Sequence, residues 1–230
     1  MASVQMLEVT NLNVSYGESW VLFDLNLTFS ENEVTVIVGR NGAGKTTLFK
    51  AISGFLKPSS GSIRLKGEDI AGVRPYKIVR MGLKYIPQDK GVFSDLTVRE
   101  NLELASYAMK DYNWDPVFYY FPKLKELLNQ KSAHLSGGER QMLMIGRAIL
   151  GKSDILLIDE PMEGLAPTIV QDLVVTFKQL AKTSSLVIVE QNLTVARELA
   201  DRLYLMKEGK VIAQISDKKD IENLSFESEL

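Results

Sequence analysis

The chain contains 230 residues, which is enough for one large domain or for one domain with a sizeable insertion. Its hydrophobic content of 45% and its charged content of 24% are typical of a globular protein that buries a core. The formal net charge of −2 argues against a protein built mainly to coat nucleic acid, although local basic patches are still allowed. The absence of cysteine excludes disulfides and thiolate metal sites and allows a reducing compartment.

The sequence shows no pattern for secretion or for crossing a membrane. Residues 1–9 lack a basic segment followed by an apolar core, so we expect no signal peptide. No apolar run approaches the roughly 20 residues that a membrane-spanning helix requires. We therefore expect any work at a membrane to be done through a partner.

The first third of the chain contains several short runs with strand patterns. Residues 23–29 alternate strictly between apolar and polar, as in a half-buried antiparallel strand, whereas the β-branched run at 34–38 predicts a buried core strand. The predicted strands cover residues 6–10, 12–16, 21–29, 34–38, 62–65 and 83–86, and the predicted helices cover residues 46–53 and 74–81.

The composition changes between residues 89 and 151, where no strong strand pattern is present. Helical patterns cover residues 97–109, 122–130 and 137–150, which predicts a helical insertion. An aromatic-rich segment lies within it and includes Trp114 and residues 118–121. We interpret this segment as packing between the insertion helices, and a surface that docks a partner is the alternative.

The α/β pattern resumes after the insertion. Predicted strands at 155–159, 186–190, 202–206 and 210–215 alternate with predicted helices at 168–181 and 193–200. Such alternation implies an α/β fold with a mostly parallel core sheet covered on both faces, and the first strands add an antiparallel β layer. The sequence thus predicts a single domain over residues 1–230, with a core of 1–88 and 152–230 and a helical subdomain of about 89–151.

A glycine-rich loop at residues 39–46 joins the core strand to the first predicted helix. Glycines let several backbone N–H groups approach one anion, and the start of the helix presents its positive end to the same anion. This setting predicts a phosphate-binding loop for a nucleotide, in which Lys45 reaches the β- and γ-phosphates and Thr46 holds Mg²⁺. The candidate nucleotide-binding residues here are Gly39, Asn41, Gly42, Ala43, Gly44, Lys45, Thr46 and Thr47. A chance match, expected in about one chain per hundred of this length, is the alternative.

The apolar strand at 155–159 ends in two carboxylates, Asp159 and Glu160. Taken alone, the pair is compatible with acidic residues that merely end a strand. Together with a phosphate-binding loop, it predicts that Asp159 engages Mg²⁺ at the edge of the sheet and that Glu160 orients the attacking water.

Residues 135–141 read Leu-Ser-Gly-Gly-Glu-Arg-Gln and open a predicted helix that could bind a second anion. Leu-Ser-Gly-Gly, 24 residues before Asp159, resembles the signature of ATP-binding cassette (ABC) ATPases. The resemblance implies a P-loop NTPase fold of the ABC type. It also implies a head-to-tail dimer, in which Ser136, Gly137 and Gly138 reach the γ-phosphate of ATP bound on a second ATPase subunit.

Further positions match the same family over about residues 6 to 215. Tyr16 lies where the family has an aromatic residue that stacks on adenine, although a tyrosine at a strand end is unremarkable by itself. Gln88 matches the glutamine that contacts Mg²⁺ or water and links the helical insertion to the core. The implied catalytic residues are Lys45, Gln88, Glu160 and Gln191, and the implied metal ligands are Thr46, Gln88 and Asp159.

Two positions depart from the general family pattern. Gln191 stands where a switch histidine is usual. Its amide can still hydrogen-bond the γ-phosphate or water, but it cannot be cationic or carry a proton. The only histidine, His134, precedes the signature, so it cannot take over that position. Ala166 stands where an aspartate is common at the dimer interface. These departures concern the rate and the detailed chemistry rather than nucleotide binding.

The segments that contain these departures, together with two others, resemble one subfamily. Residues 164–167 (Gly-Leu-Ala-Pro), 189–192 (Val-Glu-Gln-Asn), 93–102 and 121–126 resemble the second ATPase subunit of branched-chain amino-acid importers. Urea and short-amide importers are similar, and Glu163 with Gly164 leans slightly toward them. The resemblance therefore implies an ATP-hydrolysing subunit that powers import of such a solute.

The resemblance also implies partners and a location. We expect a related, non-identical ATPase subunit, two transmembrane permease subunits, an indirect link to a solute-binding protein, and no nucleic acid. The chain would lie at the cytoplasmic face of the inner membrane, bound through the permease subunits. The alternatives are a soluble ABC ATPase acting on nucleic acid or ribosomes, a scaffold that binds ATP with little turnover, and lipopolysaccharide export, for which a histidine at position 191 is expected.

Overall fold

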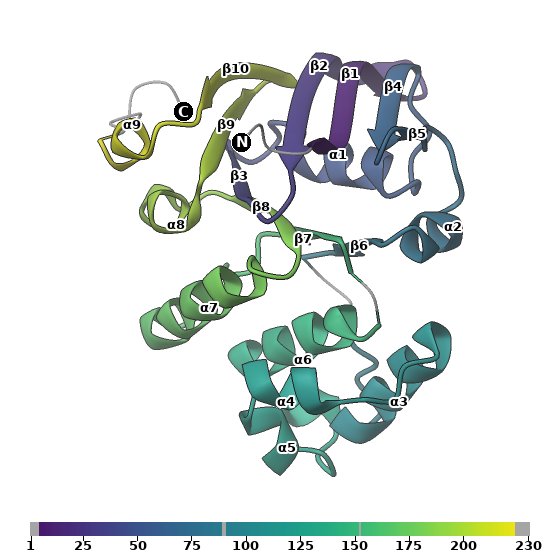
Figure 1. Cartoon of the computed structure of the whole chain (residues 1–230), viewed down its shortest axis with the longest axis vertical. Helices are drawn as coiled ribbons and strands as arrows, with labels where there is room; N and C mark the ends of the chain where they lie inside the picture. The colour runs from purple at the N-terminus through teal and green to yellow at the C-terminus, as the bar shows by residue number, and fades with distance from the viewer. Residues whose placement is uncertain (1–4, 89–90, 152, 224–230) are drawn as a thin grey trace.

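The computed structural model describes residues 5–88, 91–151 and 153–223. Figure 1 shows a small antiparallel sheet at one end of the long axis and a group of helices at the other end. A larger sheet lies between them and carries the edge at which the phosphate-binding loop emerges.

The larger sheet has six strands in the order β10-β9-β3-β8-β7-β6. Its neighbours pair in parallel, except for the antiparallel hairpin of β9 and β10. The strands are β3 (Val34–Val38), β6 (Leu83–Ile86), β7 (Ile155–Asp159), β8 (Ser185–Glu190), β9 (Arg202–Lys207) and β10 (Lys210–Ile215). All residues of β3, β7 and β8 are buried, as expected for continuous apolar strands in a sheet covered on both faces.

The smaller sheet has four antiparallel strands in the order β2-β1-β4-β5. They are β1 (Gln5–Tyr16), β2 (Ser19–Ser30), β4 (Ser60–Leu65) and β5 (Glu68–Asp69). The predicted α/β fold, with its mostly parallel core sheet and added antiparallel layer, is therefore confirmed.

The helices cover the parallel sheet and form the group at its far end (Figure 1). They are α1 (Lys45–Ile52), α2 (Pro75–Arg80), α3 (Val98–Met109), α4 (Asp115–Tyr120), α5 (Lys123–Glu126), α6 (Gly137–Ile149), α7 (Pro167–Leu180), α8 (Leu193–Leu199) and α9 (Lys218–Glu222), with a 3₁₀ turn at Ser132–His134. Helices α3 to α6 gather at that far end. Within the described ranges, no helix is both long and apolar enough to cross a membrane.

Side chains on the two faces of the parallel sheet enter two hydrophobic clusters. In β8, Leu186 and Ile188 belong to one cluster, while Val187 and Val189 belong to the other. Successive side chains of a strand point to opposite faces, so one buried strand supports both clusters. The first cluster includes apolar residues of α6, α7 and α8, and the second includes those of α1 and the antiparallel sheet.

Two predicted stretches differ from the structure by more than the one or two residues seen at the ends of the other predicted elements. The strands expected at 6–10 and 12–16 form the single strand β1, which is interrupted by a register shift between Val9 and Leu12. Asn11 accommodates the irregularity with a φ of 48°, a conformation that asparagine tolerates better than most residues. The helix expected at 122–130 ends early, because α5 stops at Glu126 and a turn follows in which the N–H of Gln130 donates to the carbonyl of Leu127.

The aromatic segment of the helical group has a mainly structural role. Phe121 is buried, and Trp114 and Phe118 pack edge to face on the same hydrophobic cluster. The side chain of Tyr119, in contrast, is 72% exposed. The packing interpretation therefore describes most of this segment.

Candidate functional site

The predicted phosphate-binding loop connects β3 to α1, and two of its glycines are required by close packing. A Cβ atom on Gly39 would lie 2.4 Å from the carbonyl oxygen of Met206. Gly44 has a φ of 99°, and a Cβ atom there would lie 2.6 Å from Leu22 Cδ2. The loop borders a hollow of about 440 Å³. This hollow is lined by residues 41–47, Val21, Gln88, Glu160 and Glu163.

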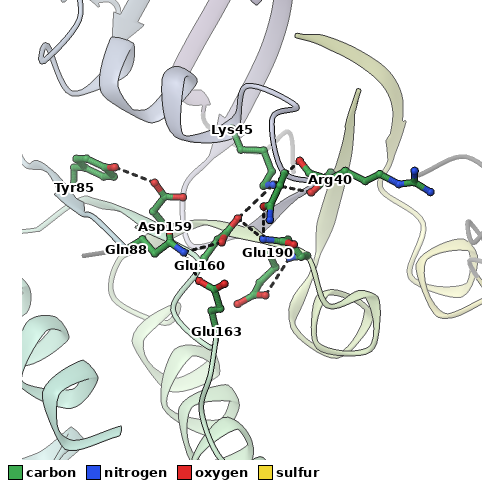
Figure 2. A network of polar contacts seen from close by, with 11 residues as sticks. Arg40, Lys45, Tyr85, Gln88, Asp159, Glu160, Glu163 and Glu190 are labelled. Carbon is green, nitrogen blue, oxygen red and sulfur yellow. Dashed lines mark hydrogen bonds and ion pairs between the residues drawn. The ribbon is translucent and has the colours of Figure 1, made fainter. Parts of the chain in front are cut away.

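Lys45 is the first residue of α1, and only 4% of its side chain is exposed. Its Nζ atom donates to the carbonyl oxygens of Gly39 (2.6 Å) and Arg40 (3.1 Å) and lies 3.4 Å from Glu160 Oε1 (Figure 2). Two carbonyls and a carboxylate thus hold the ammonium group at the hollow, where it can meet an anion.

Asp159 is the last residue of β7 and is 1% exposed. Its Oδ2 atom accepts a hydrogen bond of 3.0 Å from the Tyr85 hydroxyl, whereas its Oδ1 atom has no hydrogen-bond partner among the described residues. Burial raises the pKa of this carboxyl, and the hydroxyls of Tyr85 and Thr46 act in the opposite direction. A buried carboxylate oxygen without a partner, beside a threonine hydroxyl, suits Mg²⁺, which prefers oxygen ligands and commonly uses one or two carboxylates.

Glu160 follows β7 directly and lies at the centre of the polar network in Figure 2. Its Oε1 atom accepts from Gln191 Nε2 at 2.9 Å, and its Oε2 atom accepts from Gln88 Nε2 at 3.1 Å. The backbone has a φ of 47°, which is uncommon for a residue other than glycine and is held by the bond from its N–H to the Val189 carbonyl. Both carboxylate oxygens are therefore fixed toward the hollow.

Gln191 connects the phosphate-binding loop to Glu160. In addition to its bond to Glu160, its Nε2 atom donates to Asn41 Oδ1 at 2.7 Å. Both acceptors are side chains of this chain, so a bond from Gln191 to the γ-phosphate or to water stays a prediction. Because both contacts use the Nε2 group, Gln191 orients Glu160 as a donor and takes up no proton.

Three residues in contact with these groups were not predicted as site residues. Tyr85 donates to Asp159, and Glu163 accepts a hydrogen bond from Gln88 Nε2 (Figure 2). Burial and the charge of Asp159 raise the pKa of Tyr85, so its hydroxyl keeps its proton at neutral pH. In the sequence, only the position of Tyr85 pointed to the site, since Tyr85 lies in the strand that leads to Gln88.

Glu190 is the third of these residues. It ends β8, is 4% exposed, and burial raises its pKa to about 7. One carboxylate oxygen accepts the N–H of Gln191 at 3.2 Å, while Oε1 has no partner among the described residues. The sequence feature that could have identified Glu190 is an acidic residue directly after the apolar run at 186–189, since such a run places the carboxyl group in the interior.

Four predicted nucleotide contacts lie away from the hollow. Tyr16 is 47% exposed at the end of β1 and does not line it. Ser136, Gly137 and Gly138 begin α6, where Ser136 and Glu139 form a reciprocal capping box. A Cβ atom on Gly138 would lie 2.8 Å from Ile169 Cγ2, so this helix start packs on α7 rather than on the phosphate-binding loop of its own chain.

The strand, the glycine loop with its lysine, and the facing aspartate and glutamate have the arrangement expected of a phosphate-loop nucleotide-binding site, on a P-loop NTPase fold. A family model described as "ABC transporter" matches residues 22–163, which is more than half of the chain. The chain belongs to the ABC transporter family, as an ATPase domain.

Curated relatives and a solved structure resemble the chain over nearly its whole length. The high-affinity branched-chain amino acid transport ATP-binding protein BraG of Pseudomonas aeruginosa is 39% identical, with 90% of this chain and 91% of the relative covered. The probable branched-chain amino acid transport ATP-binding protein LivF of Archaeoglobus fulgidus is 36% identical, with 96% and 97% covered. The ADP conformation of an ATP-binding cassette of an ABC transporter is 26% identical, with a TM-score of 0.88 and coverages of 99% and 97%. The family inferred from the sequence motifs is thereby confirmed.

Proposed function

We propose that this chain is the ATP-hydrolysing subunit of a membrane importer for branched-chain amino acids or a related small polar solute such as urea or amides. The observation that carries the proposal is the position of Glu160, which Lys45, Gln88 and Gln191 hold at the edge of the hollow beside the phosphate-binding loop. The names of the two relatives described above support the class of solute.

The chemistry follows from positioning and charge. Lys45 and the loop N–H groups bind the β- and γ-phosphates, and Glu160 orients the attacking water. Asp159, Thr46 and Gln88 would hold Mg²⁺, which would neutralise charge on the phosphate oxygens. Gln191 keeps Glu160 aligned, because it is fixed by Asn41 at the same time.

The remaining predicted contacts belong to an assembly. Tyr16 stacks on the adenine at the open end of the site, and its exposure leaves its ring available. Ser136, Gly137 and Gly138 contact the γ-phosphate of ATP on a second, non-identical ATPase subunit in a head-to-tail dimer. Residues 1–230 act as one ATPase domain, with a core of 1–88 and 152–230 and a helical subdomain of about 89–151.

The assembly includes two transmembrane permease subunits, through which the chain is held at the cytoplasmic face of the inner membrane. A solute-binding protein delivers the solute to the permease subunits and does not contact this chain. Nucleic acid is not a partner in this proposal, in keeping with the net charge of −2.

The substitution Glu160→Gln tests the catalytic part of the proposal. It keeps the shape of the side chain and removes the charge that orients water, so the rate of ATP turnover should fall by about 10²-fold or more while ATP binding is retained. Glu68→Gln is the matched control, because Glu68 is exposed in β5. Turnover would be measured as phosphate release by the complex purified from native membranes. Unchanged turnover in Glu160→Gln would refute the assignment.

A further inference from the structure

Lys84 is a buried lysine that takes no part in the site described above. It lies in β6, four residues before Gln88, and is 6% exposed. Its Nζ atom donates to the carbonyl oxygens of Ala148 (2.8 Å) and Leu150 (2.5 Å). Both carbonyls are at the C-terminal end of α6, so the side chain joins a strand of the core to a helix of the helical group.

The end of α6 requires donors from outside the helix. The last carbonyls of any helix lack intrahelical partners and carry the negative end of its dipole, which favours a cation. Leu150 is extended (φ −63°, ψ 133°), so the chain leaves the helix at once. The Ser153 hydroxyl also donates to the Ala148 carbonyl at 3.1 Å, and Asp111 accepts the N–H of Gly151 at 2.9 Å. Among these contacts, only that of Lys84 comes from β6.

The two elements that Lys84 joins lead to the two parts of the proposed ATPase site. Strand β6 runs into Gln88, which contacts Glu160. Helix α6 begins next to Ser136, in the stretch that we assign to the second nucleotide of the dimer. A helix is rigid along its length, so its attachment to β6 is one of the contacts that set where the stretch at 136–138 lies, together with its packing on α3 and α7.

We propose that Lys84 is a positioning residue that fixes α6 against β6, so that Gln88 and the 136–138 end of the helix are held in one relative orientation. The inference rests on the proposed function for its consequence on turnover, but its structural consequence can be measured without any ATPase activity.

The surroundings of Lys84 make its ammonium group costly to bury. Burial lowers its pKa to about 8, and the charges of Asp111 and Asp154 only partly oppose that effect. The other charged group beside it is Arg147, which donates to the Gly91 carbonyl and lines the same hollow of about 250 Å³. An apolar side chain of similar length would avoid this cost but would give up the bonds to the Ala148 and Leu150 carbonyls.

Substitution of Lys84 by methionine separates a positioning role from a purely structural one. Lys84→Met keeps an unbranched side chain and loses both bonds to α6. We expect an unchanged KM for ATP and a kcat reduced about tenfold in the membrane-derived complex. The melting temperature should change little, because the loss of the bonds to α6 and the removal of a costly buried charge act in opposite directions. Lys66→Met is the matched control, because Lys66 is 41% exposed and pairs with Asp154 rather than with α6.

The orientation itself can be measured on the isolated full chain. The sequence has no cysteine, so spin labels can be placed at Tyr107→Cys in α3, which packs on α6, and at Glu68→Cys in β5. Double electron–electron resonance measures the distance between the two labels. The distance distribution should be broader in Lys84→Met, or centred at a different distance, when compared with the unsubstituted protein and with Lys66→Met.

The two measurements distinguish the possible outcomes. An unchanged distance distribution in Lys84→Met would overturn the inference, as would an unchanged kcat in an active complex. Absence of turnover in the parent complex would refute the proposed function instead, and the distance measurement would still decide the role of Lys84.

Discussion

The end of β7 and the start of α6 contain the two most informative motifs of the chain, and their surroundings in the structure differ. At the end of β7, Glu160 contacts groups from three other segments and faces the phosphate-binding loop. At the start of α6, the side chains of Ser136 and Glu139 each accept the backbone N–H of the other residue in a capping box, and Gly138 packs on Ile169.

This difference shows which part of the proposed ATPase site is formed by residues of one chain. The groups around Glu160 come together within one chain, whereas residues 136–138 lie outside the hollow that these groups line. A motif with anion-binding geometry and no nucleotide pocket of its own is accounted for if its ligand is bound on another subunit. Substitutions in the two regions should therefore affect binding and turnover differently.

The largest effect is expected from Lys45→Ala. The substitution removes the buried cation beside the loop, so nucleotide affinity of the isolated chain and turnover of the complex should both fall, by about 10²- to 10³-fold. Lys50→Ala is the control, since Lys50 lies on the exposed side of the same helix. Retention of full nucleotide affinity by Lys45→Ala, measured by calorimetry, would contradict the role of the loop.

The substitution Gly138→Ala tests the other region. The added Cβ atom would lie 2.8 Å from Ile169 Cγ2 and should displace the start of α6. We expect turnover to fall by about tenfold and nucleotide affinity of the isolated chain to stay the same. The double substitution Gly138→Ala with Ile169→Ala should recover part of the turnover. A loss of affinity in the isolated chain would instead place residues 136–138 at its own nucleotide.

A smaller effect is expected from Gln191→Ala. The substitution removes the donor that joins the carboxylate of Glu160 to the neutral amide of Asn41. A loss of about 1 kcal/mol of hydrogen bonding corresponds to a decrease in kcat of about fivefold. The KM for ATP should change little. Gln179→Ala, at an exposed position of α7, is the control. An unchanged kcat would show that Gln191 does not align Glu160.

The smallest effect on turnover is expected from Glu190→Gln, and it is best detected through stability. Burial raises the pKa of Glu190 from 4.5 to about 7, so the folded chain binds this proton more tightly than the unfolded chain does. The free energy of unfolding of the parent should therefore decrease as pH rises from about 4.5 to about 7, by up to about 3 kcal/mol relative to Glu190→Gln. Denaturant titrations of both proteins at pH 5 and pH 8 measure this difference. A difference that does not change with pH would contradict the buried, proton-binding carboxyl.

Local patterns carried most of what could be predicted from the sequence. The apolar run of β3, the glycines after it and Lys45 are consecutive, so spacing alone placed the loop between a strand and a helix. The period of two in β2 and the β-branched residues of β3 likewise predicted an antiparallel layer beside a buried core. These features depend on residues that are close together in the sequence, and such residues are the ones that a periodic pattern describes.

Contacts between residues that are distant in the sequence could not be predicted from local patterns. The bond from Tyr85 to Asp159 joins residues 74 positions apart, and the bond from Lys84 to Leu150 spans 66 positions. Their formation depends on which strands pair and where a helix ends, neither of which a local pattern specifies. The early end of α5 belongs to the same class, because packing rather than helix propensity sets the length of so short an element.

A crosslinking measurement tests most directly the claim that a second subunit completes the site. A photoreactive side chain at position 140, which is exposed one turn beyond the start of α6, would be introduced into the Glu160→Gln protein. The tagged protein would be purified with its companions from detergent-solubilised native membranes, irradiated in the presence of Mg-ATP, and analysed by mass spectrometry. The account predicts an ATP-dependent crosslink to the phosphate-binding loop of another ATPase subunit, in a complex that contains two multi-span proteins. A crosslink to residues 39–46 of the same chain, or recovery of only ribosomal or other soluble companions, would contradict it.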